Sequence, residues 1–310
     1  MSEAPTQAHS AVHRFAIATA VSTVVLLMAG ALVTSNDAAD SVPDWPLAYG
    51  KIIPPLVGGI RYEFAHRVVA GVVAVLTTIL AIWLARSESR RFVRRLGWTA
   101  LGLVIVQALL GAGRVLLGHP PLIATIHATV AQIFFIMTVA LAFYTAPGTR
   151  GHVVQLDDPG SPHVRALTLW TTGVIFVQLI LGAGFRHGAF GILPHILGAC
   201  AVTFFVIWAA RVAKNRFGHI AQVRRLVVLL HATFGTQILL GIAAYWAVAE
   251  AIHEAQPTMP YVVLTVAHVL VGALVLAVSV LLTLSCFRLI RPVASSAVRS
   301  STTESEPVRP

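Results

Sequence analysis

The stretch that decides how this chain folds is residues 63–71, which read EFAHRVVAG and open a long apolar run. A carboxylate, an imidazole and a guanidinium stand close together there, in Glu63, His66 and Arg67. Ionisable groups are costly at the mouth of a membrane helix unless they bind or react. The stretch therefore predicts a membrane-spanning helix with a functional site at its start.

The composition agrees with a membrane protein. Of the 310 residues, 57% are hydrophobic and 11% are charged, whereas soluble domains carry about 25% charged residues. The net charge of +10 comes from basic residues between the apolar runs, as the positive-inside rule expects, so we expect no nucleic-acid partner. The two cysteines, Cys200 and Cys286, form no metal-binding or disulfide pattern.

Eight apolar runs are long enough to span a bilayer, which takes roughly 20 residues as a helix. The first exceeds the apolar part of a signal peptide and is expected to remain as an anchor. We therefore predict an all-α integral membrane fold, with eight transmembrane helices arranged as two pseudo-symmetric four-helix bundles. The runs are Phe15–Thr34, Tyr62–Ala85, Leu96–Leu117, Leu122–Tyr144, Ala166–Phe185, Ile192–Val212, Leu226–Val248 and Tyr261–Phe287.

The distribution of basic residues predicts the orientation. Only five of the 22 Lys and Arg residues lie at the connections after the odd-numbered runs, and the rest lie at the termini and the other connections. Both termini are therefore expected in the cytoplasm, in a multi-pass protein of the bacterial inner (plasma) membrane. The even-numbered helices then begin at the outer side.

Four histidines recur near the starts of these even-numbered runs: His66, His127, His195 and His268. The residue four positions after each is Ala or Gly, on the same helix face, and we expect a shallow notch there that admits something flat. A sequence of the form Gln-(three residues)-Gly also recurs in the preceding runs, at 107–111, 178–182 and, more weakly, 237–241. Repeated hairpins of this kind build many membrane folds.

We interpret the four histidines as two pairs of axial ligands for two hemes, since neutral imidazole is a standard ligand of heme iron. Hydrogen bonds between helices or a zinc or copper site are the alternatives. Glu63 has no counterpart near the other three histidines, so it is either a helix-start carboxylate or a proton acceptor beside a reactive heme. Arg67, Arg114 and Arg186 could pair with heme propionates or extend toward the outer surface.

The chain is expected to divide into five parts. Residues 1–14 form a cytoplasmic tail, 15–145 the first four-helix half with the substrate heme site, and 146–165 a cytoplasmic linker. Residues 166–288 form the second half with the heme b site, and 289–310 a disordered cytoplasmic tail rich in Ser, Thr, Pro and charge.

The chain resembles the heme A synthases, eight-helix membrane enzymes that oxidise heme O to heme A for cytochrome oxidases. The resemblance rests on PDWP at 43–46, EFAHR at 63–67 and the Gln/Gly hairpins with the later histidines, and it runs from about residue 15 to 288. Many bacterial members carry a cysteine pair in the first outer loop. In this chain that loop has no cysteine, and Val42 stands just before PDWP.

The resemblance implies that His66 and His127 hold the substrate heme O and that His195 and His268 hold a resident heme b. It implies that Glu63 acts in catalysis, while a porphyrin methyl group becomes hydroxymethyl and then formyl. Possible partners are a heme O synthase, oxidase assembly factors, a quinone or other electron acceptor, and a second copy of the chain. The alternative functions are a non-catalytic membrane cytochrome b for electron transfer and a heme transporter or chaperone.

Overall fold

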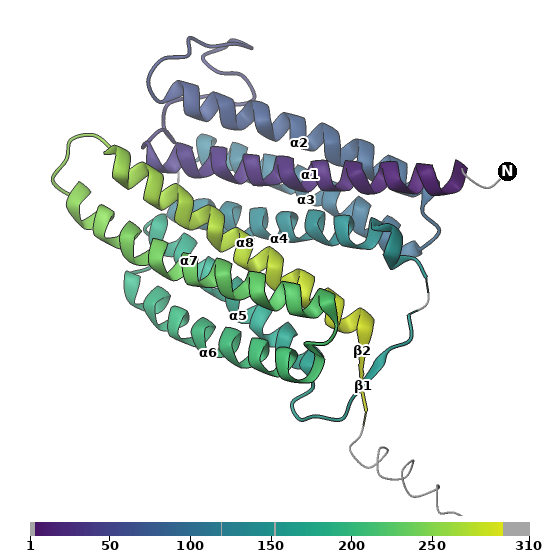
Figure 1. Cartoon of the computed structure of the whole chain (residues 1–310). Helices are drawn as coiled ribbons and strands as arrows, with labels where there is room; N and C mark the ends of the chain where they lie inside the picture. Colours follow the sequence, from purple (N-terminus) through teal and green to yellow (C-terminus); the bar gives the residue numbers. More distant parts are fainter. Residues whose placement is uncertain (1–3, 119, 152, 294–310) are drawn as a thin grey trace, which may run out of the picture.

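The computed structural model describes residues 4–118, 120–151 and 153–293. Eight long helices run antiparallel to one another, side by side (Figure 1). Within the described residues, all eight are long and apolar enough to cross a membrane, with mean hydropathies of 1.8 to 2.6. This confirms the predicted all-α, eight-span membrane fold. The helices are α1 (Ala4–Ser35), α2 (Ile60–Ser87), α3 (Arg91–Leu116), α4 (Pro121–Thr145), α5 (Val164–Arg186), α6 (Ile192–Phe217), α7 (Ala221–Ala251) and α8 (Met259–Leu289).

The helix ends follow local sequence. After α5, Gly188 adopts a φ of 74°, and the amides of Gly188 and Ala189 donate to the carbonyls of Phe185 and Gly184. Glycine takes this left-handed conformation without steric cost, and the two bonds satisfy carbonyls that the helix leaves open. The chain therefore turns within a few residues of Arg186, which brings α6 back beside α5.

Helix α8 lies at the centre of the molecule. It contacts α1 and α4 from the first half and α5 and α7 from the second. In its most apolar window 61% of the residues are buried, against 11% to 33% in the other seven helices. One apolar core is formed by the four helices α1, α2, α3 and α4, and a second is formed mainly by α5, α6, α7 and α8. Helix α8 also packs against α1 and α4 through Ala273 and Ala277.

Several boundaries differ from the expected ones. Helix α1 begins at Ala4, within the expected N-terminal tail, and Val12 is fully buried there. The linker contains a short 3₁₀ helix, η1 (Pro147–Thr149), and the strand β1 (Leu156–Asp158). In the expected disordered tail, residue 289 still belongs to α8, the strand β2 (Ile290–Pro292) follows, and residues 294–310 lie outside the described part of the chain.

The linker between the halves is tied to the end of α8. Strands β1 and β2 pair in parallel, with Leu156 opposite Ile290 (Figure 1). Asp158 is 1% exposed, and its carboxylate accepts hydrogen bonds from the amides of Gly160 and Val164 and from Arg216 on α6. A buried carboxylate is stable only when it is bonded in this way. The linker is therefore an ordered structural element that joins α4, α6 and α8.

Glu88 plays a comparable part in the turn between α2 and α3. Its carboxylate accepts from the Arg90 guanidinium at 2.9 Å through both oxygens and pairs with Arg150 at 3.2 Å. Arg90 also donates to the carbonyl of Tyr144 at the end of α4. Burial alone would raise the pKa of Glu88, but the bonds from Arg90 and the charge of Arg150 outweigh it and lower that pKa to about 2.

We expect Glu88→Gln to lower the free energy of unfolding by about 1.5–3 kcal/mol at neutral pH, the usual contribution of hydrogen bonds to a charged group. The folded pKa lies below the ordinary value of 4.5. The stabilisation is therefore complete above about pH 4.5 and disappears as the pH falls toward 2. Thermal unfolding in detergent between pH 3 and pH 8 measures the difference between variant and wild type.

The matched control is Glu250→Gln, since Glu250 is an exposed carboxylate on α7. This control should unfold like the wild type at every pH. A Glu88→Gln variant whose deficit stays the same from pH 8 to pH 3 would show that the ionised carboxylate is not the source of the stabilisation.

Candidate heme-binding site

The four predicted histidines lie on the even-numbered helices, toward the ends at which those helices begin. His66 lies on α2, His127 on α4, His195 on α6 and His268 on α8, and all four are half-buried. This is the end of the bundle that also carries the long loop between α1 and α2 (Figure 1). The fold thus gathers four imidazoles at one end of the membrane-spanning helices.

Each histidine ring packs against a glycine on the helix that precedes it in the chain. A Cβ atom added to the glycine would lie 3.2 Å from Cε1 of the ring for Gly30 and His66, and 3.6 Å for Gly111 and His127. The corresponding distances are 2.8 Å for Gly182 and His195 and 3.0 Å for Gly241 and His268. The contact at Gly182 leaves no room for a methyl group, those at Gly30 and Gly241 are tight, and that at Gly111 is an ordinary van der Waals contact. The glycines of the repeated sequence therefore allow the rings to lie on the helix backbone.

The expected notch at the fourth residue after each histidine is not open in every hairpin. At Gly272, four residues after His268, a Cβ would lie 3.0 Å from Nε2 of Gln237 and 3.3 Å from Cδ2 of Leu179. This expectation is wrong at Gly272, because side chains from α5 and α7 fill the space. The small residues that matter for ring placement are the glycines of the facing odd-numbered helices.

The glutamines of the repeat contact the histidine rings of the second half. Nε2 of Gln178 lies 3.1 Å from Nδ1 of His195 and donates to the His195 carbonyl at 2.8 Å. Nε2 of Gln237 lies 3.3 Å from Nε2 of His268. In α1 the position four residues before Gly30 is Leu26, so the first hairpin has no glutamine there. The two halves therefore differ in how their rings are held.

The pair in the second half has the spacing of two ligands of one ion. The ring centroids of His195 and His268 are 6.2 Å apart, with the ring planes at 84°. A bond from imidazole to a metal is about 2.0–2.1 Å long, and the ring nitrogen lies roughly 1 Å from the ring centre, so two opposed ligands place their centroids about 6 Å apart. Among the described residues, Nδ1 of His66, His127 and His268 is buried without a hydrogen-bond partner. These imidazoles therefore fit a site that would hold heme iron.

Glu63 and Arg67 form an ion pair that fastens the long outer loop to α2. The Arg67 guanidinium donates to Oε1 of Glu63 at 2.6 Å, and the amide of Val42 donates to Oε2 at 3.0 Å. Arg67 also donates to the carbonyls of Asp44 and Leu47. Glu63 is 5% exposed. Its carboxylate is thus buried and held from two sides, one helical turn before His66 on a neighbouring part of the same face.

Asp44 of the Pro-Asp-Trp-Pro sequence organises the loop itself. Its two carboxylate oxygens accept from the amides of Tyr49 at 2.6 Å and Gly50 at 2.7 Å. The bond from Gly50 contributes most to lowering the pKa of Asp44 below its ordinary value. The Tyr49 hydroxyl then donates to the carbonyl of Ser41. The motif therefore forms a closed turn whose backbone carbonyls meet Arg67.

The three arginines predicted as propionate partners lie in different surroundings. Arg67 is bonded to Glu63 and to the loop, as described. Arg186 donates to the carbonyl of Ala31 at 3.1 Å and to Oγ of Ser35 at 2.6 Å, which links α5 to the end of α1. Arg114 has a buried Nε without a hydrogen-bond partner among the described residues. Binding of a propionate by any of the three stays a prediction.

His187 is a residue whose position the sequence did not indicate. It lies in the outer connection after α5, where a solvated or interfacial side chain is expected, and the structure half-buries it there. Burial lowers its pKa to about 4, and the positive charges of Arg114 and Arg186 add to the effect. Arg114 belongs to the first half and Arg186 to the second, so His187 lies where the halves meet. No pattern within one helix could reveal this position.

The fold and this arrangement define a multi-pass membrane protein that presents four imidazoles at one end of its helix hairpins. Residues 60–193 match the family model described as "Cytochrome oxidase assembly protein". This region includes Glu63, His66 and His127 and ends just before His195.

Three curated relatives, each named heme A synthase, are similar to this chain. The protein from Alkalihalophilus pseudofirmus is 31% identical over 47% of this chain and 50% of its own length. That from Halalkalibacterium halodurans is 28% identical over 74% of this chain and 77% of its own length. That from Lysinibacillus sphaericus is 35% identical over 56% and 57%. The chain thus covers about half of the length of two of these relatives. The chain is thus similar, over about half of its length or more, to proteins named heme A synthase.

The contact between glycine and histidine can be tested at Gly182. A Cβ there would lie 2.8 Å from Cε1 and 3.1 Å from Nδ1 of His195, so Gly182→Ala must displace the ring. We expect the purified variant to contain several-fold less heme than the wild type. The absorbance of the Soret band per protein measures the heme content.

Gly173→Ala is the matched control, because Gly173 lies on the same helix and a Cβ there meets nothing within 4 Å. This variant should retain heme like the wild type. Equal heme content in the two variants would show that the close approach at Gly182 is not needed for binding.

Proposed function

We propose that the protein is a heme A synthase, an oxidoreductase that converts one methyl group of heme O into a formyl group through a hydroxymethyl stage. The observation that carries the proposal is Glu63, a buried carboxylate held by Arg67 and the Val42 amide close to His66. An electron-carrying cytochrome needs the histidines but has no use for such a carboxylate. The relatives named heme A synthase support the same activity.

We propose that the two halves hold different hemes. The first half, with His66 and His127, binds heme O as substrate, because only this half has a carboxylate, Glu63, three residues before a histidine of the set. The second half holds heme b through His195 and His268, whose ring spacing suits a shared iron. When bound, heme b supplies one-electron redox chemistry. Gln178 orients the His195 ring by its contact with Nδ1, which leaves Nε2 to act as ligand.

Glu63 acts on protons or water beside the substrate methyl group in this proposal. With water as the oxygen source, oxidation of a methyl carbon to a formyl carbon releases four electrons and four protons, so a nearby base is required. The Glu63 carboxylate is suited to accept a proton or to orient water. Arg67 and the loop hold it in place, since Arg67 bonds Glu63 and the carbonyls of Asp44 and Leu47 at once. The electrons would leave toward a quinone or a similar acceptor.

We infer that the protein works in the bacterial inner membrane with both termini in the cytoplasm. Of its 22 Lys and Arg residues, 17 lie on the side that carries the termini. The active end would then face the periplasm. A heme O synthase would supply the substrate, and assembly factors for cytochrome oxidase would receive the product.

The central test replaces Glu63 by Gln and measures the hemes formed. The variant and a heme O synthase are produced together in a host that makes no heme A, and extracted hemes are identified by mass. We expect bound heme to persist while the yield of formyl and hydroxymethyl products falls by at least 100-fold, the lower range for loss of a general base. An unchanged product yield would exclude a role for this carboxylate in the chemistry.

Arg67→Gln separates the chemical role of Glu63 from its structural role. This variant breaks the same 2.6 Å ion pair but keeps the carboxylate, so it should retain more product than Glu63→Gln. If both variants lose product equally, loss of the loop attachment explains the effect without a chemical role for Glu63.

The assignment of heme b to the second half is tested by His195→Ala. We expect the purified variant to lose most of its heme b, seen as loss of the reduced α-band, because one of the two imidazoles that would hold it is removed. His231→Ala is the control, since His231 lies on α7 and its Nδ1 bonds the carbonyl of Val227 in its own helix. Full heme b content in His195→Ala would contradict the pairing of His195 with His268.

A further inference from the structure

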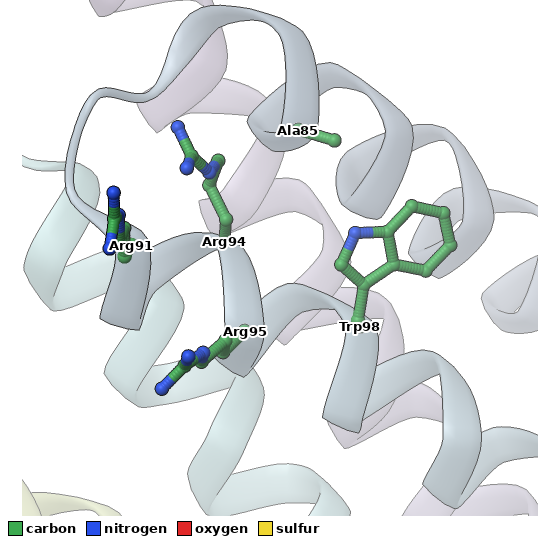
Figure 2. Close-up of a pocket in the computed structure, with 5 residues that line it drawn as sticks. All are labelled: Ala85, Arg91, Arg94, Arg95 and Trp98. Carbon is green, nitrogen blue, oxygen red and sulfur yellow. The ribbon is translucent and has the colours of Figure 1, made fainter.

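A basic pocket lies at the opposite end of the molecule from the histidines, between α2 and α3. Its volume is about 360 Å³, and it is lined by Ala85 of α2 and by Arg91, Arg94, Arg95 and Trp98 of α3. Figure 2 shows the three guanidinium groups around the first turns of α3, with the indole of Trp98 one turn further along. The proposed heme chemistry uses none of these residues.

The four side chains share one helix face. They stand at positions i, i+3, i+4 and i+7, which are neighbours on an α-helix surface. Among the pairs of helices in close contact, α3 packs only against α2 and α4, and Ala85 of α2 lines the pocket beside this face. Phe92 and Trp98 are each 50% exposed. Exposed aromatic residues near the end of a span are typical of the lipid headgroup level.

The guanidinium groups of this pocket make few hydrogen bonds to other parts of the protein. Arg94 donates one bond, to the carbonyl of Glu88. In the described part of the chain, the guanidinium groups of Arg91 and Arg95 make no hydrogen bond or ion pair to a protein group. The nearest carboxylate in the sequence, Glu88, is 3% exposed and already bonded by Arg90 and Arg150. The positive charge of the pocket therefore has no protein counter-charge within its lining.

We propose that this pocket binds the phosphate of an anionic phospholipid from the membrane leaflet on the side of the chain termini. Arginine forms forked hydrogen bonds to phosphate, and basic pockets at the ends of membrane helices bind anionic headgroups. The apolar face of α3 beyond Trp98, with Ile105 56% exposed, continues from the pocket along the bilayer and suits the acyl chains. This continuity favours a lipid over free phosphate.

The site also has a structural consequence. Helices α2 and α3 form the hairpin whose far end carries Glu63 and His66, and Arg94 bonds the Glu88 carbonyl in its turn. A phosphate that bridges Arg91 and Arg95 would hold the start of α3 against the membrane surface. The lipid would thereby fix the depth of the hairpin in the bilayer.

The test uses the full-length protein in nanodiscs of zwitterionic phosphatidylcholine, into which brominated phosphatidylglycerol is titrated. Bromine quenches nearby indoles, and the Trp98 signal is the difference between the wild type and Trp98→Phe. We expect saturable quenching at a low fraction of phosphatidylglycerol, and weak, non-saturating quenching by brominated phosphatidylcholine. Increasing salt should weaken the binding of the anionic lipid.

The variant Arg91→Gln/Arg94→Gln/Arg95→Gln should weaken the apparent affinity at least about tenfold, since each basic residue near the surface contributes substantially to lipid attraction. The control is Arg224→Gln/Arg225→Gln, which removes exposed charges at the start of α7, away from the pocket. If the triple variant is not monodisperse, Arg95→Gln alone replaces it, because the Arg95 guanidinium makes no hydrogen bond or ion pair among the described residues. Equal quenching by both lipids, or an equal loss of affinity in the control, would overturn the proposal.

Discussion

Close contact between an imidazole ring and a glycine on the neighbouring helix is the interaction on which the arrangement of this protein depends. Four histidine rings lie against Gly30, Gly111, Gly182 and Gly241. A Cβ at Gly30, Gly182 or Gly241 would lie 2.8 to 3.2 Å from the ring and press on it, whereas at Gly111 it would make an ordinary contact at 3.6 Å. In three of the four hairpins the contact therefore constrains both the helix spacing and the position of the ring. Because small residues permit close helix approach in membranes, where no hydrophobic driving force joins helices, the same glycines also favour packing.

The two halves share these helix hairpins but differ in the polar groups near the histidine rings. In the second half, glutamine amides touch the rings of His195 and His268. In the first half, the outstanding polar group is the Glu63–Arg67 pair, which reaches outward and fastens the loop through Val42, Asp44 and Leu47. A pair of rings held by neutral amides suits a resident cofactor. A ring beside a buried carboxylate under a fastened loop suits a site in which a substrate reacts.

The end of the molecule that carries the chain termini is held by a different type of contact. Glu88 and Asp158 are buried carboxylates, and each binds a nearby backbone amide together with one arginine distant in sequence, Arg150 for Glu88 and Arg216 for Asp158. Arg216 of α6 thereby meets the linker, and Arg90 meets the end of α4. Removal of one partner from a buried pair is costly, because the remaining charge stays desolvated. The two halves are thus joined at this end by polar contacts, while α8 joins them by apolar packing within the bundle.

The sequence by itself determined the eight membrane helices, because each apolar run is long enough to cross a bilayer and no other backbone arrangement satisfies its hydrogen bonds there. It also identified His66, His127, His195 and His268 by their repeated positions, and Glu63 as the carboxylate without a counterpart. Only the tertiary structure showed that the glycines of the facing helices, and not the small residue after each histidine, make room for the rings. It also revealed that Arg67 holds the loop, that His187 is half-buried between the halves, and that the linker pairs with the end of α8. These features depend on contacts between segments far apart in the chain, and local periodicity carries no information on such contacts.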